Sequence, residues 1–227
     1  MLPKHHRLSP LSKDLSGPFN CSYLDMIADQ LSTDGYVLLP SALPEPLLLS
    51  LHHRAQSLTA KHWRTAGVGR AKQYQVDQQI RSDKIHWMNP DNEAEAGFLA
   101  HMDQLRQGLN QRLYMGLFDY ESHFSIYQKG DFYQKHIDAL KGRSNRVLST
   151  VCYLNRHWQD SDAGELLLYT PDGEQLLAKV APTYGTLLIF LSEQFPHQVL
   201  AANRARYSIA GWFRVNSNRS GIIDPAR

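Results

Sequence analysis

Residues 125–138 read SIYQKGDFYQKHID, and this stretch indicates the fold class. A β-rich run ends at Tyr127, a Lys-Gly pair gives a turn signal, and an extended segment then carries His136 and Asp138. Side chains two positions apart project from the same face of an extended segment, so the imidazole and the carboxylate can converge on one point. The stretch therefore predicts strands that present a polar site.

Short β-rich runs continue after this stretch, and turn signals with Gly or Pro separate them. With the run that opens the stretch, they cover residues 123–127, 147–154, 165–169, 175–180, 186–191 and 207–215. Before the stretch, apolar residues recur three and four positions apart, which predicts helices. The expected helices cover residues 23–31, 41–58 with Ser41 as a cap, and 98–117, with a short strand at 36–39. Helices followed by strands predict an α+β fold, mainly β, in which the helices buttress a β-sandwich or barrel.

The composition fits a folded protein with one main unit. Of the 227 residues, 42% are hydrophobic and 20% are charged, which excludes a wholly disordered chain. A net charge of +2 disfavours nucleic acid or an anionic membrane as a partner, and no apolar run is long enough to span a bilayer. The two cysteines, Cys21 and Cys152, form neither a disulfide framework nor a CxxC metal site. We therefore expect a soluble, cytoplasmic protein.

We expect four segments along the chain. Residues 1–20 lack periodicity and are expected to form a flexible N-terminal arm. Residues 21–118 are expected to form a helical support region with short strands, 119–216 the β-rich core, and 217–227 a C-terminal tail. Residues 21–216 are expected to fold as one structural unit.

A second histidine and an arginine extend the polar site. His197 follows Asp138 by 59 residues, at a Phe-Pro turn between two apolar strands. Two histidines and one carboxylate form the facial triad that binds Fe(II) and leaves three positions open. Nine residues after His197 comes Arg206, whose guanidinium suits bidentate capture of a carboxylate, and Ser208 can add a hydroxyl on the same face.

The other histidines have simpler interpretations. His101 and Asp103 also stand two positions apart, but the surrounding period is helical, so their side chains point away from each other and cannot share a metal. The remaining histidines are expected on surfaces or in satisfied hydrogen bonds: His52, His53, His62, His86, His123 and His157.

From about residue 79 to residue 215, the sequence resembles the iron- and 2-oxoglutarate-dependent oxygenases, and within them the oxygen-sensing type of prolyl 4-hydroxylase. The motifs that carry the resemblance are residues 80–87 (IRSDKIHW), 153–155, 163–166, 190–192 and 206–209, together with Tyr127, Trp158 and Trp212. Two positions depart from the family pattern, because Ala163 replaces the first Gly of a common Gly-Gly pair and Ser82 replaces a Gly.

The resemblance implies a double-stranded β-helix (jelly-roll) core and a role for each site residue. It implies that His136, Asp138 and His197 ligate iron, and that Arg206 pairs with the distal carboxylate of 2-oxoglutarate. The other residues that it places around the co-substrate are Tyr153, Ser208, Tyr127 and Leu166. It places Tyr133, Arg146 and Trp212 at the mouth where a prolyl residue enters, with Asp83 and Arg146 as an ion pair that shapes this mouth. Its cofactors are Fe(II), 2-oxoglutarate and O2, with L-ascorbate as a further candidate.

The reaction implied is hydroxylation of a prolyl residue in a protein, coupled to decarboxylation of 2-oxoglutarate to succinate. Resemblance to bacterial members points to a ribosome-associated or translation protein such as elongation factor Tu as the substrate. A free amino acid such as proline, or another small molecule, is an alternative substrate. The oligomeric state is not indicated by the sequence.

Three other classes use related sites. By resemblance, nucleic-acid demethylases carry a second arginine six residues after the co-substrate arginine, whereas here the next is Arg214, eight residues later. Cupin-type metal-binding proteins take a third His or Glu close to the first pair, and residues 139–146 offer none. A non-catalytic binding module would lack a ligand of the triad, and all three ligands are present.

Overall fold

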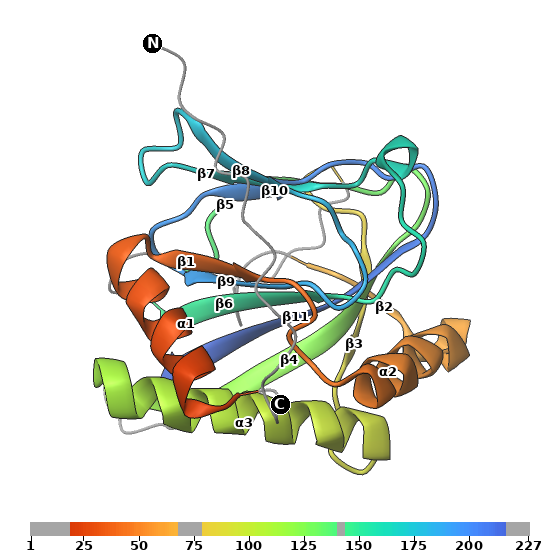
Figure 1. Ribbon diagram of the computed structural model, residues 1–227. Coiled ribbons are helices and arrows are strands. Elements are labelled where there is room, and N and C mark those ends of the chain that lie inside the picture. The colour runs from red at the N-terminus through yellow and green to blue at the C-terminus, as the bar shows by residue number, and fades with distance from the viewer. Residues whose placement is uncertain (1–18, 68–78, 140–143, 217–227) are drawn as a thin grey trace.

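Two antiparallel β-sheets face each other in the computed structural model, which describes residues 19–67, 79–139 and 144–216 (Figure 1). The seven-stranded sheet has the order β1-β9-β6-β11-β4-β3-β2, and its strands are β1 (Tyr36–Leu39), β2 (Arg64–Thr65), β3 (Lys84–Trp87), β4 (Leu117–Tyr127), β6 (Arg146–Tyr153), β9 (Leu187–Leu191) and β11 (Arg206–Val215). The four-stranded sheet has the order β5-β10-β7-β8, and its strands are β5 (Tyr133–His136), β7 (Leu166–Tyr169), β8 (Leu176–Val180) and β10 (His197–Val199). This arrangement is the expected double-stranded β-helix.

Three helices cover the outer face of the seven-stranded sheet, and Figure 1 shows α3 running below it. They are α1 (Cys21–Thr33), α2 (Glu45–Ser57) and α3 (Glu93–Leu113), with short 3₁₀ turns at Ala60–His62 and Asp160–Asp162. The apolar residues that recur three and four positions apart in the first helix are buried as expected: Leu24, Ile27, Ala28 and Leu31. No helix in the described part of the chain is long and apolar enough to cross a membrane.

Alternation along β11 divides the core into two layers. Ile209 and Phe213 point toward the helices and pack in one cluster with Phe98 and Met102. The even-numbered residues from Arg206 to Arg214 face the four-stranded sheet instead, and they form the floor of the space between the sheets. The inner face of β11 therefore positions the polar groups of the molecule.

Helix ends differ from the sequence prediction. Ser41 is not a cap, because it has a positive φ of 54° and the helix begins only at Glu45, after Pro44. The third helix begins five residues before the expected position, where the Asn92 side chain accepts hydrogen bonds from two backbone N–H groups. It ends at Leu113 because Tyr114 adopts the left-handed conformation, and Leu117 already belongs to β4.

Strands were predicted more closely than helices. The runs at 147–154, 165–169, 175–180, 186–191 and 207–215 all form strands within one residue of the expected ends, and the run at 123–127 is the second half of the longer β4. Strands β2, β3 and β10 were not predicted as strands, whereas β5 lies in the segment that was predicted to be extended. Most of the N-terminal arm (1–20) and the tail (217–227) lie outside the described residues, so both remain predictions.

Candidate active site

The predicted triad comes together between the two sheets. His136 ends β5 and His197 begins β10, and the two residues are direct partners in the register of these strands. Asp138 follows β5 in a bend rather than in an extended segment, yet its Oδ1 lies 3.5 Å from Nε2 of His136. One ligand atom from each residue lies within 4.8 Å of the others. The predicted convergence is confirmed, and the cross-strand pair explains why His136 and His197, 61 positions apart, meet.

Hydrogen bonds determine which atoms of the triad are free to bind a metal. Nδ1 of His136 lies 2.8 Å from the carbonyl of Gln134, and Nδ1 of His197 lies 3.0 Å from the carbonyl of Phe195. An Nδ1–H that donates to a carbonyl leaves Nε2 free for a metal. On Asp138, Oδ2 accepts hydrogen bonds from Ser149 Oγ (2.6 Å) and Trp212 Nε1 (3.0 Å), which sets the orientation of the carboxylate.

Protonation at neutral pH also suits a metal. Burial by itself would raise the pKa of Asp138, but the two imidazoles and the Ser149 hydroxyl hold this pKa well below its ordinary value. Burial, aided by His136, lowers the pKa of His197 to about 4. An ionised carboxylate and a neutral imidazole are the forms that bind metals. Two nitrogens and one oxygen on one side of an ion fit Fe(II), which the family resemblance implies.

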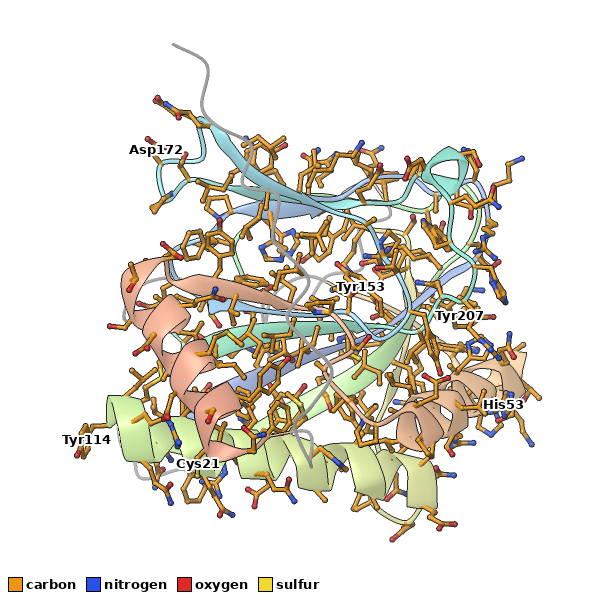
Figure 2. The ribbon with its side chains drawn as sticks, in the orientation of Figure 1. Cys21, His53, Tyr114, Tyr153, Asp172 and Tyr207 are labelled. Atoms are coloured by element: carbon orange, nitrogen blue, oxygen red, sulfur yellow. The ribbon has the colours of Figure 1, made fainter. Side chains whose placement is uncertain are left out.

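An unpaired cation lies at one end of the inner face. Arg206 is 1% exposed, and its Nε and Nη2 have no hydrogen-bond partner in the part of the chain that the structure describes. The hydroxyl of Tyr153 is also buried and unpartnered, and Figure 2 shows this tyrosine in the space between the sheets. The guanidinium lies 4.9 Å from the ring of Tyr127 and 5.0 Å from the ring of Tyr153. A buried guanidinium with two unpartnered nitrogens is costly, so this end of the site, which we call the closed end, is built for an anion.

The remaining predicted co-substrate residues surround the same point. Arg206 donates from Nη1 to Ser208 Oγ at 3.4 Å, and Leu166 packs in one buried cluster with Tyr153. A Cβ at Gly164 would lie 2.7 Å from Cβ of Ala202 and 3.4 Å from Cδ of Arg206. The Gly164 backbone therefore packs closely against Ala202 and the aliphatic part of Arg206, where a larger residue would not fit.

The predicted Asp83–Arg146 ion pair is wrong. Both oxygens of Asp83 accept hydrogen bonds from Arg81, at 2.7 Å each, because the arginine two residues earlier folds back onto the fully buried carboxylate. Arg146 instead passes over the ring of Trp212, 3.5 Å from its centroid, and donates to Glu121. Strand β11 separates β6 from β4, so an arginine on β6 reaches a carboxylate on β4 across this tryptophan. The departure at Ser82 adds a contact, since its Oγ accepts from the backbone N–H of Phe132.

A charged network at the other end of the inner face was missed in the sequence. Arg214 is 2% exposed and forms ion pairs with Asp119 and Glu121. The network therefore consists of Asp119, Glu121, Arg146 and Arg214. We call the end of the inner face that these residues occupy the open end. Asp119 and Glu121, at alternate positions just before the predicted run 123–127, and Arg214, two positions after Trp212 in the run 207–215, are the signal that could have placed the network on one face.

The histidines that were set aside do not join the triad. His101 lies on α3 and contacts the carbonyl of Gly97 in the same helix, while Asp103 binds Arg106, so the rejection of this pair is confirmed. His123 is hydrogen-bonded as expected, with Ser125 Oγ at 3.1 Å from its Nδ1, but it is buried on the inner face beside Trp212. It is therefore a further residue of the site that sequence reasoning missed.

Comparisons with known proteins agree with this geometry. A model described as the 2OG-Fe(II) oxygenase superfamily matches residues 122–214. The crystal structure of a Pseudomonas putida prolyl-4-hydroxylase is 37% identical and superposes with a TM-score of 0.77, over 86% of this chain and 100% of that chain. The chain belongs to the 2OG-Fe(II) oxygenase superfamily. Within it, this oxygenase is of the prolyl hydroxylase type.

Two further relatives of this oxygenase are animal proteins. A prolyl hydroxylase from Trichoplax adhaerens, solved with a hypoxia-inducible factor peptide, is 26% identical with a TM-score of 0.76, over 86% of this chain and 90% of that chain. Egl nine homolog 1 of Homo sapiens is 30% identical over 141 residues, which are 59% of this chain and 33% of the relative. The chain thus matches only about a third of the length of this curated relative.

Proposed function

We propose that this oxygenase is a protein prolyl 4-hydroxylase, which couples decarboxylation of 2-oxoglutarate to succinate with hydroxylation of a prolyl residue. The observation that carries the proposal is the buried Arg206 beside a triad suited to Fe(II): two of its nitrogens, like the hydroxyl of Tyr153, have no partner among the described residues. A dicarboxylate that binds the metal through one end can present its other carboxylate to this guanidinium. The family of the chain supports the same co-substrate.

The side chains of the site have distinct roles in this reaction. Arg206 binds and orients the distal carboxylate, and Tyr153 donates to it, because burial raises the pKa of this phenol to about 12 and keeps it protonated. Asp138 remains ionised and correctly oriented through Ser149 and Trp212. Fe(II) bound by His136, Asp138 and His197 would supply the activation of O2 that hydroxylation needs.

A prolyl substrate is favoured over nucleic acid by the open end. Arg214 is saturated by Asp119 and Glu121 and is almost fully buried, so it is not available as a second ligand-binding arginine. Relatives named as prolyl hydroxylases, one of them solved with a peptide, support a polypeptide substrate. A free amino acid such as proline is the second candidate, because the triad and the closed end would serve either substrate equally.

The finer assignments are part of the same proposal. Elongation factor Tu is the candidate substrate, with the cytoplasm as the site of action. Ascorbate is a candidate reductant that keeps the metal in its ferrous state.

Mass spectrometry tests the proposal. The full chain is incubated with Fe(II), 2-oxoglutarate and a native bacterial proteome, and in parallel with purified elongation factor Tu and with free proline. We expect peptides in which a proline has gained one oxygen atom, together with succinate, and neither product with Asp138→Ala. Succinate formation with oxygen added only to free proline would support the second candidate, and no 2-oxoglutarate consumption in any arm would contradict the proposed class.

A further inference from the structure

A three-layer stack connects the mouth to one metal ligand. The ring of Tyr133 lies 3.5 Å from the imidazole of His136, centroid to centroid, with only 13° between the planes. On its other face, the guanidinium carbon of Arg81 lies 4.3 Å from the centroid of the same ring. The order is thus guanidinium, phenol, imidazole, and this arrangement is not explained by the roles assigned above.

The outer layer of the stack is rigidly held. The guanidinium of Arg81 donates two hydrogen bonds of 2.7 Å to Asp83, whose side chain is fully buried. The planar fork of an arginine is fixed in orientation by such a bidentate contact. The cation is therefore held in place over the ring of Tyr133 rather than moving freely over it.

The backbone adds a second constraint. Arg81 and Tyr133 form an isolated antiparallel bridge. On either side of it, the N–H of Ser82 donates to the carbonyl of Phe132 at 3.1 Å, and the N–H of Gln134 donates to the carbonyl of Ile80 at 2.8 Å. Residues 80–82 therefore lie against β5, the strand that ends at His136.

The two histidines of the triad differ in what holds their rings. His197 is almost buried, with 6% side-chain exposure, and Phe190 packs edge-on against it at 4.8 Å. His136 has 16% side-chain exposure, and among the described residues its ring is held by one hydrogen bond from Nδ1 and by the ring of His197, 4.2 Å away centroid to centroid, so it can still tilt about the Nδ1 bond away from His197. The contact that opposes such tilting on the mouth side is the face of Tyr133.

We propose that Arg81, acting through Tyr133, is a positioning residue that fixes the ring plane of His136 for metal binding. The proposal rests on the proposed function only in that the triad binds a divalent metal. Groups around a metal ligand that set its orientation change metal affinity by about 10-fold to 100-fold when they are removed. The stack would connect the mouth of the site with a metal ligand through packing contacts.

Titration calorimetry of Mn(II) into the full-length apoprotein tests the stack. We expect Tyr133→Leu to weaken Mn(II) binding by about tenfold or more, because the face against His136 is lost. Tyr133→Phe keeps that face and is expected to bind Mn(II) like the unmodified protein. The double variant Arg81→Met/Asp83→Asn removes both charges together, so no buried charge is left unpaired, and we expect a loss of about two-fold to five-fold.

A matched control is Tyr169→Leu. The ring of Tyr169 is also covered by a cation, since Nζ of Lys135 lies 4.2 Å from its centroid. In the described part of the chain, however, this ring does not stack on a histidine of the triad. We expect its Mn(II) affinity to stay unchanged. The visible spectrum of bound Co(II) gives a second measurement, which we expect to shift for Tyr133→Leu and not for Tyr133→Phe or Tyr169→Leu.

The outcomes separate this inference from the proposed function. Unchanged Mn(II) affinity and an unchanged Co(II) spectrum in both Tyr133→Leu and the double variant would overturn the positioning role. If Tyr133→Leu does not fold, the double variant alone decides, and equal affinity to the unmodified protein overturns the inference. An unmodified protein that binds Mn(II) and 2-oxoglutarate but hydroxylates no proline contradicts the proposed function alone.

Discussion

The two ends of the inner face of β11 contain arginines that differ only in their partners. Arg206 and Arg214 lie eight residues apart on the same face of one strand, and both are at most 2% exposed. Arg214 is saturated by two carboxylates, whereas two nitrogens of Arg206 have no partner among the described residues. Burial alone therefore does not identify a ligand-binding arginine. The hydrogen-bond partners of the arginine identify it, because a buried cation that lacks acceptors is stable only when a ligand supplies them.

The largest expected effect is at the closed end. Arg206→Met should weaken 2-oxoglutarate binding by about a thousandfold, since a buried, charge-assisted contact worth about 4 kcal/mol is lost. Arg206→Lys keeps the charge but not the fork, and we expect at least about a tenfold loss. Calorimetric titration of 2-oxoglutarate with Mn(II) present measures both.

The apoprotein gives the complementary result for Arg206→Met. Because two of the guanidinium nitrogens have no partner among the described residues, its removal should leave the free energy of unfolding unchanged or raise it. Arg156→Met, an exposed position, is the control for the loss of one charge. A clear loss of stability together with full affinity for 2-oxoglutarate would make Arg206 a structural residue and remove the contrast between the two ends.

The same substitution at the open end should have the opposite result. Arg214→Met leaves Asp119 and Glu121 without their shared cation, and we expect the free energy of unfolding to fall by about 3 kcal/mol. The affinity for 2-oxoglutarate should change little, because Arg214 lies at the far end of the strand. Urea unfolding and the same calorimetry measure the two quantities. A variant as stable as the unmodified protein would show that the open-end network contributes no net stability.

His123, between the two ends, should make folding sensitive to acid. Burial, together with Arg81, lowers the pKa of His123 from 6.5 to about 3. The unfolded chain takes up this proton below about pH 6.5 and the folded chain does not, so the stabilising contribution is full above pH 6.5 and is lost as the pH falls toward about 3. The expected loss from this residue between pH 7 and pH 5 is about 2 kcal/mol.

Urea unfolding of the apoprotein at these two pH values checks the prediction. His123→Met should reduce the difference in unfolding free energy between pH 7 and pH 5 by about 2 kcal/mol. His53→Gln, on the exposed side of α2, serves as the control. An identical pH dependence in His123→Met and the unmodified protein would mean that the buried imidazole is charged or solvated in the folded state.

The sequence allowed some residues of the site to be placed correctly and others not. The triad and Arg206 were predictable, because each stands at a fixed distance from the next within a β-rich pattern that the family also carries. The pairing within the mouth was not predictable. Whether Asp83 meets Arg81 or Arg146 depends on how a short segment docks on a neighbouring strand, which no local pattern encodes.

Secondary structure shows the same limit. Apolar strands such as β9 were predicted because Gly and Pro punctuate them, whereas β5 reads YQKH and β10 reads HQV, so both form through pairing rather than through propensity. The helix at Glu93 starts at an Asn cap before any apolar stripe begins, and it ends on a tyrosine in a conformation that usually takes Gly. Pairing between distant strands decided β5 and β10, whereas the ends of this helix depend on the conformations of Asn92 and Tyr114.

The smallest expected effect concerns the turn beside Arg206. Ala163 adopts φ 53° and ψ −143°, a conformation that is favourable only for Gly. Backbone strain of this kind costs about 1–3 kcal/mol, and the greater freedom of Gly in the unfolded chain offsets about 0.4–1 kcal/mol of any relief. We therefore expect Ala163→Gly to raise the free energy of unfolding by about 1 kcal/mol without changing the affinity for 2-oxoglutarate. Ala181→Gly, at a residue without a positive φ, should instead lower it by about 0.4–1 kcal/mol. If both variants lose stability equally, the turn is unstrained, and the tight packing at Gly164 alone shapes the closed end.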